Sequence, residues 1–261
     1  NVESDLIRRM ADHSPPSFRK IYNRIEAAKY KNEEMQALQR ADLVLATSER
    51  DATLMRQSLP SLHTAVMSNG VDCAYFKNPG RTPQPNTLGL VGATHYFPNE
   101  DGIHYYMRSI HPLLISEVPD LKVSIVGGRP PASIRAYASP NVVVTGFVDD
   151  VRPYMHESAV FIVPLRMGGG TRFKVVEAMA AGTPVVSTSL GSEGIPVQNG
   201  VQAMLADTPE QFAAAVLNIL RDQKRADALR NEGRAFVRKH FDWGVIGQKL
   251  NAEIERLKHR V

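Results

Sequence analysis

From Thr87 onward, short apolar segments alternate with segments of helical character, and this alternation constrains the fold more than any other feature of the chain. The apolar segments have strand length and cover residues 87–92, 121–128, 141–146, 159–164 and 183–188, with a weaker one near 201–206. Helical segments follow them near residues 100–115, 133–138, 151–156, 171–181 and 209–222. Strands that alternate with helices pair in parallel, and helices then cover both faces of the sheet. The sequence therefore predicts an α/β fold with a parallel sheet between two layers of helices.

The residues before Thr87 follow a different pattern. Helical spacing and short strand-like runs occupy residues 19–40, 43–47 and 64–68, and two helical segments end the chain at 224–239 and 243–258. Three prolines and no periodicity between Lys77 and Asn86 are typical of a linker. We therefore divide the chain into an N-terminal part with a hinge, a linker, a ligand-binding domain, and a C-terminal helix expected to pack back toward the N-terminal part, at residues 1–76, 77–86, 87–240 and 241–261.

Composition excludes several classes of protein. Of the 261 residues, 43% are hydrophobic and 22% are charged, which is ordinary for a soluble globular protein. One cysteine, Cys73, rules out an intramolecular disulfide and suits a reducing compartment. No apolar run approaches the roughly 20 residues that cross a bilayer. We therefore expect a cytoplasmic location.

The C-terminal tail carries the excess of positive charge. The formal net charge is +4, and residues 224–260 contain ten Lys or Arg against five Asp or Glu. A solvated face of two helices is the simplest interpretation, and peripheral contact with anionic lipid at the inner membrane is an alternative. No aromatic and basic motif accompanies the charge, so we expect no nucleic acid partner.

Residues 168–182, GGGTRFKVVEAMAAG, conflict with the usual rules for a helix. Arg172 and Lys174 would lie in its first turn, where each cation opposes the helix dipole by roughly 0.3–1 kcal/mol. Lys174 also stands three residues after the expected cap, Thr171, where a capping box has Glu or Gln. Glu177 falls among apolar residues, where a carboxylate needs hydrogen bonds. An anion at the helix start and hydroxyl groups near Glu177 would resolve these conflicts.

The loops that follow the strands are the expected binding region, because ligands of parallel sheets bind at the carboxyl ends of the strands. Gly127 and Gly128 would let the backbone approach a ligand there. His95 and Glu193 lie in two of these loops and are candidates for ligand or loop contacts.

Each candidate also has a purely structural interpretation. In this interpretation His95 is a polar loop residue, Glu193 is a turn cap, and Glu177 is bonded to a loop amide. Arg172 and Lys174 would in that case be solvated or paired with the carboxylates of Asp149 and Asp150.

Other types of site are disfavoured. The glycines match neither the GxGxxG nor the GxxxxGK[ST] pattern, and no GxSxG nucleophile motif is present. The eight histidines form no HxxxH or HxH pair, and a single cysteine cannot build a thiolate site. Asp150 is well placed as a helix N-cap. We therefore expect neither a metal nor a bound cofactor.

Residues 144–195, with EAMAAGTPVV at their centre, resemble the donor-binding half of glycosyltransferase family 4, the retaining GT-B enzymes. SNGVD, LVGATHYFPNEDGI and the final DW also match, at residues 68–72, 90–103 and 242–243. ADLVLATSERD (41–51) resembles the end of the family's N-terminal acceptor domain. The resemblance implies a Rossmann-like domain that forms the C-terminal half of a GT-B fold, preceded by a remnant of the acceptor domain.

The resemblance also implies roles for single residues. Glu177 matches the second glutamate of the family's E-x7-E motif, which binds the ribose hydroxyls. The diphosphate-binding segment corresponds to Gly169, Gly170, Thr171, Arg172 and Lys174. The nucleobase region corresponds to Phe147, Val148, Gly127 and Gly128.

The chain departs from the family pattern in three places. Gly169 replaces the first glutamate of E-x7-E, so the usual contact to the donor sugar is lost or replaced. Residues 93–102 lack the family's Arg and Lys, and we infer that Arg172 and Lys174 neutralise the diphosphate instead. Most of the N-terminal domain, with its acceptor-site histidine, is also missing from the sequence.

We therefore expect a retaining glycosyltransferase that moves a sugar from a UDP or GDP sugar to a saccharide or lipid-linked acceptor in polysaccharide or glycolipid biosynthesis. Two alternatives remain open: a nucleotide-sugar-binding module that is inactive alone, and a sugar-nucleotide epimerase of the same fold. Residues 1–58 should carry apolar faces that either dock on the C-terminal helices or mediate self-association.

Overall fold

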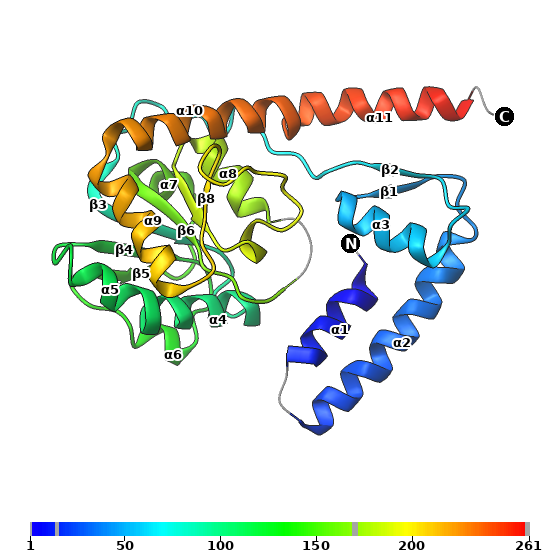
Figure 1. The fold of residues 1–261 in the computed structure, drawn as a ribbon, viewed down its shortest axis with the longest axis horizontal. Helices are drawn as coiled ribbons and strands as arrows, with labels where there is room; N and C mark the ends of the chain where they lie inside the picture. The colour runs from blue at the N-terminus through cyan, green and yellow to red at the C-terminus, as the bar shows by residue number, and fades with distance from the viewer. Residues whose placement is uncertain (1, 14–15, 169–171, 259–261) are drawn as a thin grey trace.

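The computed structural model describes residues 2–13, 16–168 and 172–258, and its larger body is built on a six-stranded sheet (Figure 1). The strands are β3 (Gln84–Val91), β4 (Lys122–Val126), β5 (Val142–Val144), β6 (Ser158–Val163), β7 (Val185–Ser187) and β8 (Met204–Leu205). They lie in the order β5-β4-β3-β6-β7-β8, and every neighbouring pair is parallel. The expected α/β fold is confirmed. Strand β3, the first of this sheet along the chain, begins at Gln84, three residues earlier than the sequence indicated.

Two layers of helices bury the two faces of the sheet. One face packs on a continuous run of α4 (Phe97–Tyr105), a π-helical turn (Tyr106–Ile110) and α5 (His111–Ile115), together with α6 (Ala132–Arg135) and α9 (Pro209–Arg221). The other face packs on α7 (Arg152–Glu157), α8 (Phe173–Ala181) and the later part of α10 (Gln223–His240), whose first turns pack in the core of the first face. Successive strand residues alternate between the faces, as Phe161 and Ile162 do, and both are fully buried. The apolar residues of the strands are therefore buried on both sides.

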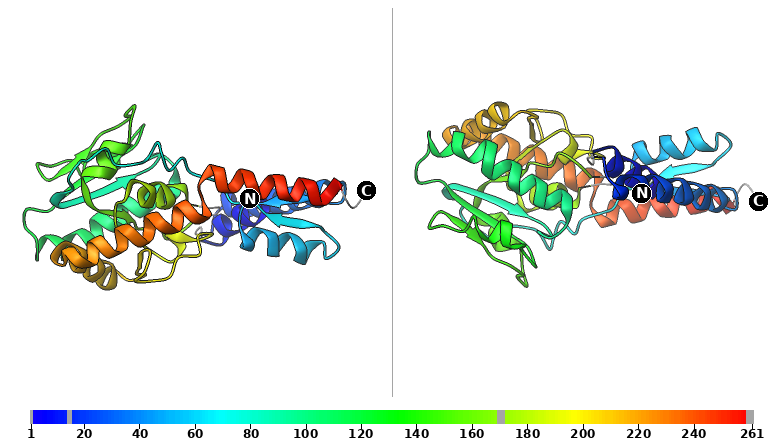
Figure 2. Two further views of the ribbon diagram at one scale, coloured as in Figure 1. Left: turned by 90° about the horizontal axis from the view of Figure 1, so that it is seen from above. Right: turned by 90° about the horizontal axis from the view of Figure 1, so that it is seen from below.

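A smaller N-terminal part precedes the linker. It contains α1 (Glu3–His13), α2 (Phe18–Leu38), β1 (Val44–Ala46), α3 (Glu49–Ser58) and β2 (Thr64–Val66), with β1 and β2 parallel. The last helix, α11 (Trp243–Lys258), extends from α10 over this part (Figures 1 and 2). Backbone hydrogen bonds join the hinge to the start of α11, from Val71 N to Phe241 O (2.7 Å) and from Trp243 N to Val71 O (3.3 Å).

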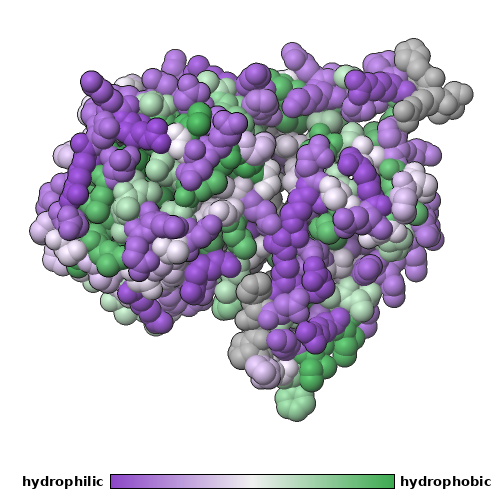
Figure 3. Space-filling view, viewed as in Figure 1, coloured by the Kyte–Doolittle hydropathy of each residue, from purple (hydrophilic) through white to green (hydrophobic). Residues whose placement is uncertain are grey.

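Apolar side chains are exposed at the beginning of α2. Phe18 is 93% exposed, and Ile21, Tyr22 and Ile25 are each more than half exposed. Apolar residues gather at the lower tip of the molecule in Figure 3, where α2 begins. The suggestion that such a face mediates self-association stays a prediction.

Helix α8 ends at Gly182, and two arginines of α10 bind carbonyl groups at this end of the helix. Gly182 has a φ of +78°, the left-handed conformation that glycine adopts without strain. Arg230 Nε donates to Gly182 O (3.0 Å), and Arg234 Nη2 donates to Ala181 O (3.1 Å). These contacts place two cations at the negative end of the helix dipole, so the C-terminal end of α8 is firmly anchored.

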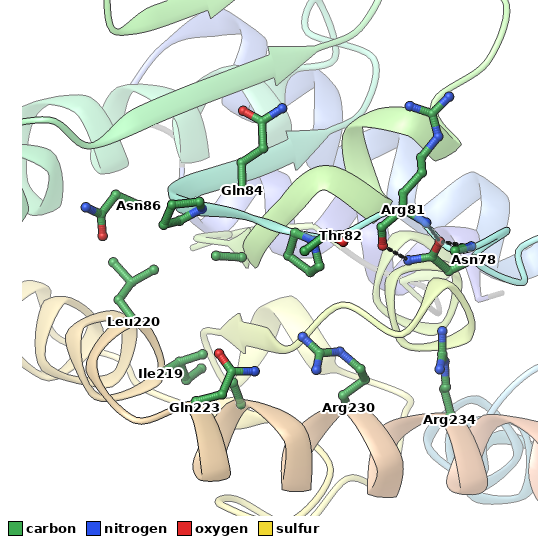
Figure 4. Close-up of a pocket in the computed structure, with 15 residues that line it drawn as sticks. Asn78, Arg81, Thr82, Gln84, Asn86, Ile219, Leu220, Gln223, Arg230 and Arg234 are labelled. Carbon is green, nitrogen blue, oxygen red and sulfur yellow. Dashed lines mark hydrogen bonds between the residues drawn. The ribbon is translucent and has the colours of Figure 1, made fainter.

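The same arginines line a cavity of about 570 Å³ at the amino edge of the sheet, between the linker and α9 and α10 (Figure 4). Arg81 of the linker lines it as well and pairs with Glu157. Arg230 pairs with Asp227 in addition to its bond to Gly182. Because all three side chains already hold elements of the fold together, we interpret this cavity as structural.

We predict that Gly182→Ala lowers the free energy of unfolding by about 1–3 kcal/mol, the cost of a left-handed non-glycine residue. The new Cβ would also lie 2.2 Å from Arg234 Nε. Urea unfolding followed by circular dichroism measures the change.

Gly247→Ala is the matched control, because it lies within α11 with nothing inside 4 Å of a new Cβ. We expect this variant to be more stable than the wild type by about 0.5–1 kcal/mol. Equal stability of the two variants would contradict the role given to Gly182.

Candidate functional site

The strand order reverses between β3 and β6, and parallel α/β sheets bind their ligands at the carboxyl edge beside such a reversal. All six strands are parallel, so the loops that follow them lie at this same edge. The loops after β3, β4, β5, β6 and β7 contain nearly all of the residues singled out in the sequence. This edge is therefore the candidate site.

The loops after β3, β4 and β5 are drawn together by a close backbone approach. A Cβ on Gly127 would lie 1.8 Å from Gly92 O, so this position requires glycine. Gly127 N donates to Gly146 O (3.2 Å), and Thr94 Oγ1 donates to Gly128 O (2.8 Å). The three loops thus form one continuous floor.

The side chain of Phe147, in the loop after β5, lies at the surface of these three loops. Phe147 is 79% exposed, and a Cβ on Gly128 would lie 3.7 Å from its Cβ and Cδ2 atoms. Val148, by contrast, is partly buried and packs against the core beneath. An exposed ring beside open backbone suits a planar ligand group that stacks on it.

The start of α8 carries the two cations that the sequence placed there. The helix begins at Phe173, with Arg172 as its buried N-cap residue, so Lys174 occupies its first turn. Lys174 Nζ donates to Asn99 Oδ1 (2.7 Å), and Asn99 Nδ2 donates to Ala93 O (2.9 Å). The lysine is thereby fixed against the loop that follows β3.

Burial lowers the pKa of both cations. It lowers the pKa of the Arg172 guanidinium, although the nearby carboxylate of Glu193 acts in the opposite direction. Burial, together with the charge of Arg172, lowers the pKa of Lys174 to about 8. Two desolvated positive groups at a helix N-terminus have the charge that an anionic ligand would neutralise.

Glu177 lies one turn further along α8. Burial raises the pKa of its carboxyl group, and the charge of Lys174 offsets part of that rise. Within the described part of the chain no group hydrogen-bonds this carboxylate, so the bond to a loop amide considered above is not observed there. Its oxygens can accept hydrogen bonds from ligand hydroxyls.

Glu193 contacts the N-terminal part of the molecule. Arg9 of α1 donates to both carboxylate oxygens (2.7 and 2.8 Å), and Arg50 Nε of α3 lies 3.3 Å from Oε1. Burial alone would raise the pKa of Glu193, but the hydrogen bonds from Arg9 and the charges of Arg9 and Arg50 lower it below its ordinary value. Arg9 and Arg50 were not identified from the sequence, because both lie far from Glu193 along the chain, Arg9 by 184 positions, and leave no local signal.

The remaining candidates have simpler surroundings. His95 Nδ1 lies 3.4 Å from Gly128 O, as expected of a polar loop residue. Asp150 accepts a hydrogen bond from the backbone N of Arg152 (2.9 Å) and pairs with its side chain (2.8 Å), rather than with the cations of α8. Three further candidates, Gly169, Gly170 and Thr171, lie outside the described residues.

Two absences concern the described residues only. No group of three or more His, Cys, Asp or Glu side chains among them is placed to hold a metal ion. No helix in the same ranges is both long and apolar enough to cross a membrane.

The arrangement combines three kinds of recognition at one edge. Buried cations at the start of α8 match an anion, the Glu177 carboxylate matches hydroxyl groups, and the Phe147 ring matches a flat apolar group. A ligand that has all three features would use the whole site.

Comparison with known proteins identifies the family to which the chain belongs. The family model described as "Glycosyl transferases group 1" matches residues 85–222. The phosphatidyl-myo-inositol mannosyltransferase of Mycolicibacterium smegmatis is 30% identical over 195 residues, which are 70% of this chain and 49% of that protein. The chain spans about half the length of the curated relatives that it matches.

Solved structures share the fold. Sucrose-phosphate synthase from Thermosynechococcus elongatus has a TM-score of 0.73 at 22% identity, over 97% of this chain and 66% of that chain. Anabaena HepE, solved with UDP and glucose, has a TM-score of 0.70 at 18% identity, over 87% of this chain and 68% of that chain. Because the family model covers more than half of its residues, the chain belongs to the group 1 glycosyl transferases.

Proposed function

We propose that this chain is the donor-binding part of a retaining glycosyltransferase of family 4, which transfers a sugar from a nucleoside diphosphate sugar to an acceptor. One observation carries the proposal. Arg172 and Lys174 are desolvated at the N-terminus of α8, beside the point where the strand order reverses. Burying two cations at the positive end of a helix is unfavourable unless an anion binds there.

The donor extends along the crevice in this proposal. Its diphosphate binds the start of α8 through Arg172 and Lys174, together with Gly169, Gly170 and Thr171. Its ribose hydroxyls donate to Glu177. Its base lies on Phe147, over the floor formed by Val148, Gly127 and Gly128. His95 and Glu193 stand at the donor-sugar end, where Gly169 leaves no carboxylate of the usual motif.

The chemistry follows from these positions. Negative charge develops on the diphosphate as the bond to the sugar breaks, and Arg172 and Lys174 stabilise that charge without solvent reorganisation. These cations supply the role that a metal ion has in other transferases, so the reaction requires no metal. The acceptor attacks from the same face of the sugar, which retains the anomeric configuration.

The acceptor is held outside the part of the protein described here. The chain spans about half of its curated relatives, so we propose that it binds donor alone and transfers sugar only within the longer protein. The name of the M. smegmatis relative, a phosphatidyl-myo-inositol mannosyltransferase, supports a lipid-linked acceptor. Polysaccharide or glycolipid assembly in the cytoplasm, at the inner face of the membrane, is consistent with such an acceptor.

The function is tested by the affinity for UDP and GDP, with and without their sugars, measured by calorimetry. We predict that Arg172→Gln and Lys174→Gln each weaken the preferred diphosphate about 10-fold to 100-fold, because each removes a charge-assisted hydrogen bond. EDTA should leave the affinity unchanged.

Arg166→Gln is the matched control, because Arg166 precedes α8 in the same loop but is half exposed and pairs with Asp101 (2.6 Å). Its affinity should stay within about twofold of the wild type, as expected for an exposed ion pair. Unchanged affinity in the Arg172 and Lys174 variants would refute the diphosphate assignment. Release of nucleotide from the donor by the longer protein then tests transfer itself.

Diphosphate binding should weaken as the pH rises through about 8. Lys174 loses its proton near that value in the free protein, below its ordinary pKa of 10.5, whereas a bound diphosphate favours the charged form. Binding therefore takes up a proton, and the affinity falls by up to about tenfold per pH unit above 8.

Calorimetry between pH 7 and 9.5, in two buffers that differ in ionisation enthalpy, measures both the affinity and the proton uptake. The phosphate groups are fully ionised over this range and add no titration of their own. The Lys174→Gln variant should lose the pH dependence. An affinity that rises with pH would show that Lys174 does not bind the diphosphate.

Glu177→Gln should weaken ribonucleotide binding by about tenfold, because a charged acceptor of two ribose hydroxyls is lost. The same substitution should change the affinity for the 2′,3′-dideoxynucleotide by less than about twofold, since that analogue lacks both hydroxyls. Calorimetry with the two nucleotides gives the ratio. Equal losses for both would exclude a contact between Glu177 and the ribose.

A further inference from the structure

Four charged residues from three segments form a closed ring beside the start of α8. Arg9 binds Glu193 (2.7 Å) and Asp5 (3.2 Å), while Arg50 binds Asp5 (2.5 Å) and Glu193 (3.3 Å). Signs alternate around the ring, so every contact is attractive. Asp5, Arg9 and Arg50 belong to α1 and α3, whereas Glu193 follows β7.

Arg9 is the member of the ring that touches both loops flanking α8. Its Nη1 donates to Gly168 O (3.2 Å) in the loop after β6 and to Glu193 Oε2 (2.8 Å) in the loop after β7. About a fifth of each of the Arg9 and Glu193 side chains is exposed, so water screens their attraction only in part. A bidentate arginine and carboxylate pair is also directional. Arg9 thus fixes the two loops relative to each other.

The second consequence of this contact is electrostatic. The Arg172 guanidinium at the start of α8 lies against Gly168, the residue that Arg9 binds, since a Cβ on Gly168 would be 2.9 Å from Arg172 Nη2. The charge of Glu193 also raises the pKa of Arg172. With both oxygens of Glu193 bound to Arg9, the carboxylate is turned toward α1 and its charge is balanced there. Without Arg9 the same carboxylate would compete with a bound anion for Arg172.

We propose that Arg9 is a positioning residue of the donor site, which sets the affinity for the diphosphate by holding Glu193 away from Arg172. The proposal rests on the proposed function, because it assigns Arg172 to the diphosphate. Arg9 itself need not touch the nucleotide. The N-terminal part therefore acts on donor binding through its ionic contacts with Glu193, of which the two from Arg9 are the shortest.

A double-mutant cycle on Arg9 and Glu193 tests this assignment. Calorimetry gives the affinity for a nucleoside diphosphate and for the corresponding nucleoside. Arg9→Ala should lower the affinity for the diphosphate about tenfold and leave the affinity for the nucleoside within about twofold of the wild type, since the base and ribose contacts are unchanged. In the Glu193→Gln background, Arg9→Ala should change the diphosphate affinity by less than about threefold, because the competing charge is gone.

Arg8→Ala is the matched control. Arg8 lies on the same helix, is more than half exposed, and pairs only with Asp5 and Asp12 of α1 among the described residues. The Arg8→Ala substitution removes the same charge but no contact with either loop. The affinities for the nucleoside diphosphate and for the nucleoside should therefore stay within about twofold of the wild type.

The possible outcomes distinguish a failure of the proposed function from a failure of the role given to Arg9. If the wild-type chain binds no nucleoside diphosphate, the proposed function fails, and this inference fails with it. If the wild type binds but Arg9→Ala does not weaken the diphosphate, or weakens the nucleoside equally, only the inference is overturned. If Arg9→Ala still weakened diphosphate binding about tenfold in the Glu193→Gln background, the inference would likewise be overturned. Arg9 would then have a role independent of the carboxylate.

Discussion

The hydrogen bond from Lys174 Nζ to Asn99 Oδ1 (2.7 Å) is the interaction on which the site depends. It holds a cation in the first turn of α8, where burial, the helix dipole and Arg172 all disfavour positive charge. Asn99 is itself buried and donates to Ala93 O, so the lysine is tied to the loop that follows β3. The opposite end of α8 is held by Arg230 and Arg234. A helix anchored at its favourable end can carry an unfavourable charge at the other.

Much of the fold could be predicted because its signals are local. Apolar runs separated by helical segments specify parallel strands, and Phe161 and Ile162 show how each run serves both faces of the sheet. The conflict at Arg172, Lys174 and Glu177 was also visible, because helix rules concern neighbours along the chain.

The contacts that could not be predicted join residues that are far apart in the sequence. Helix α1 has few apolar residues and is held by polar contacts, such as Ser4 N to Glu34 Oε1 (3.1 Å) and Arg9 to Glu193. Neither pair leaves a periodic pattern. The bond between Lys174 and Asn99 spans 75 positions and was missed for the same reason. Residues 1–58 were expected to carry apolar faces that dock on the C-terminal helices or mediate self-association, which stays a prediction. Their described contact with the site is ionic.

The two kinds of contact have different consequences for a binding site. An apolar contact is insensitive to the charge of a nearby ligand, whereas an ionic ring beside the α8 N-terminus responds to it. The ring of Asp5, Arg9, Arg50 and Glu193 contains two charges of each sign and adds no net charge to the crevice. The sign of the potential at the start of α8 is then set by Arg172 and Lys174, together with the helix dipole. Under the proposed function, selectivity for an anion would therefore depend on a carboxylate, Glu193, remaining bound by the N-terminal part.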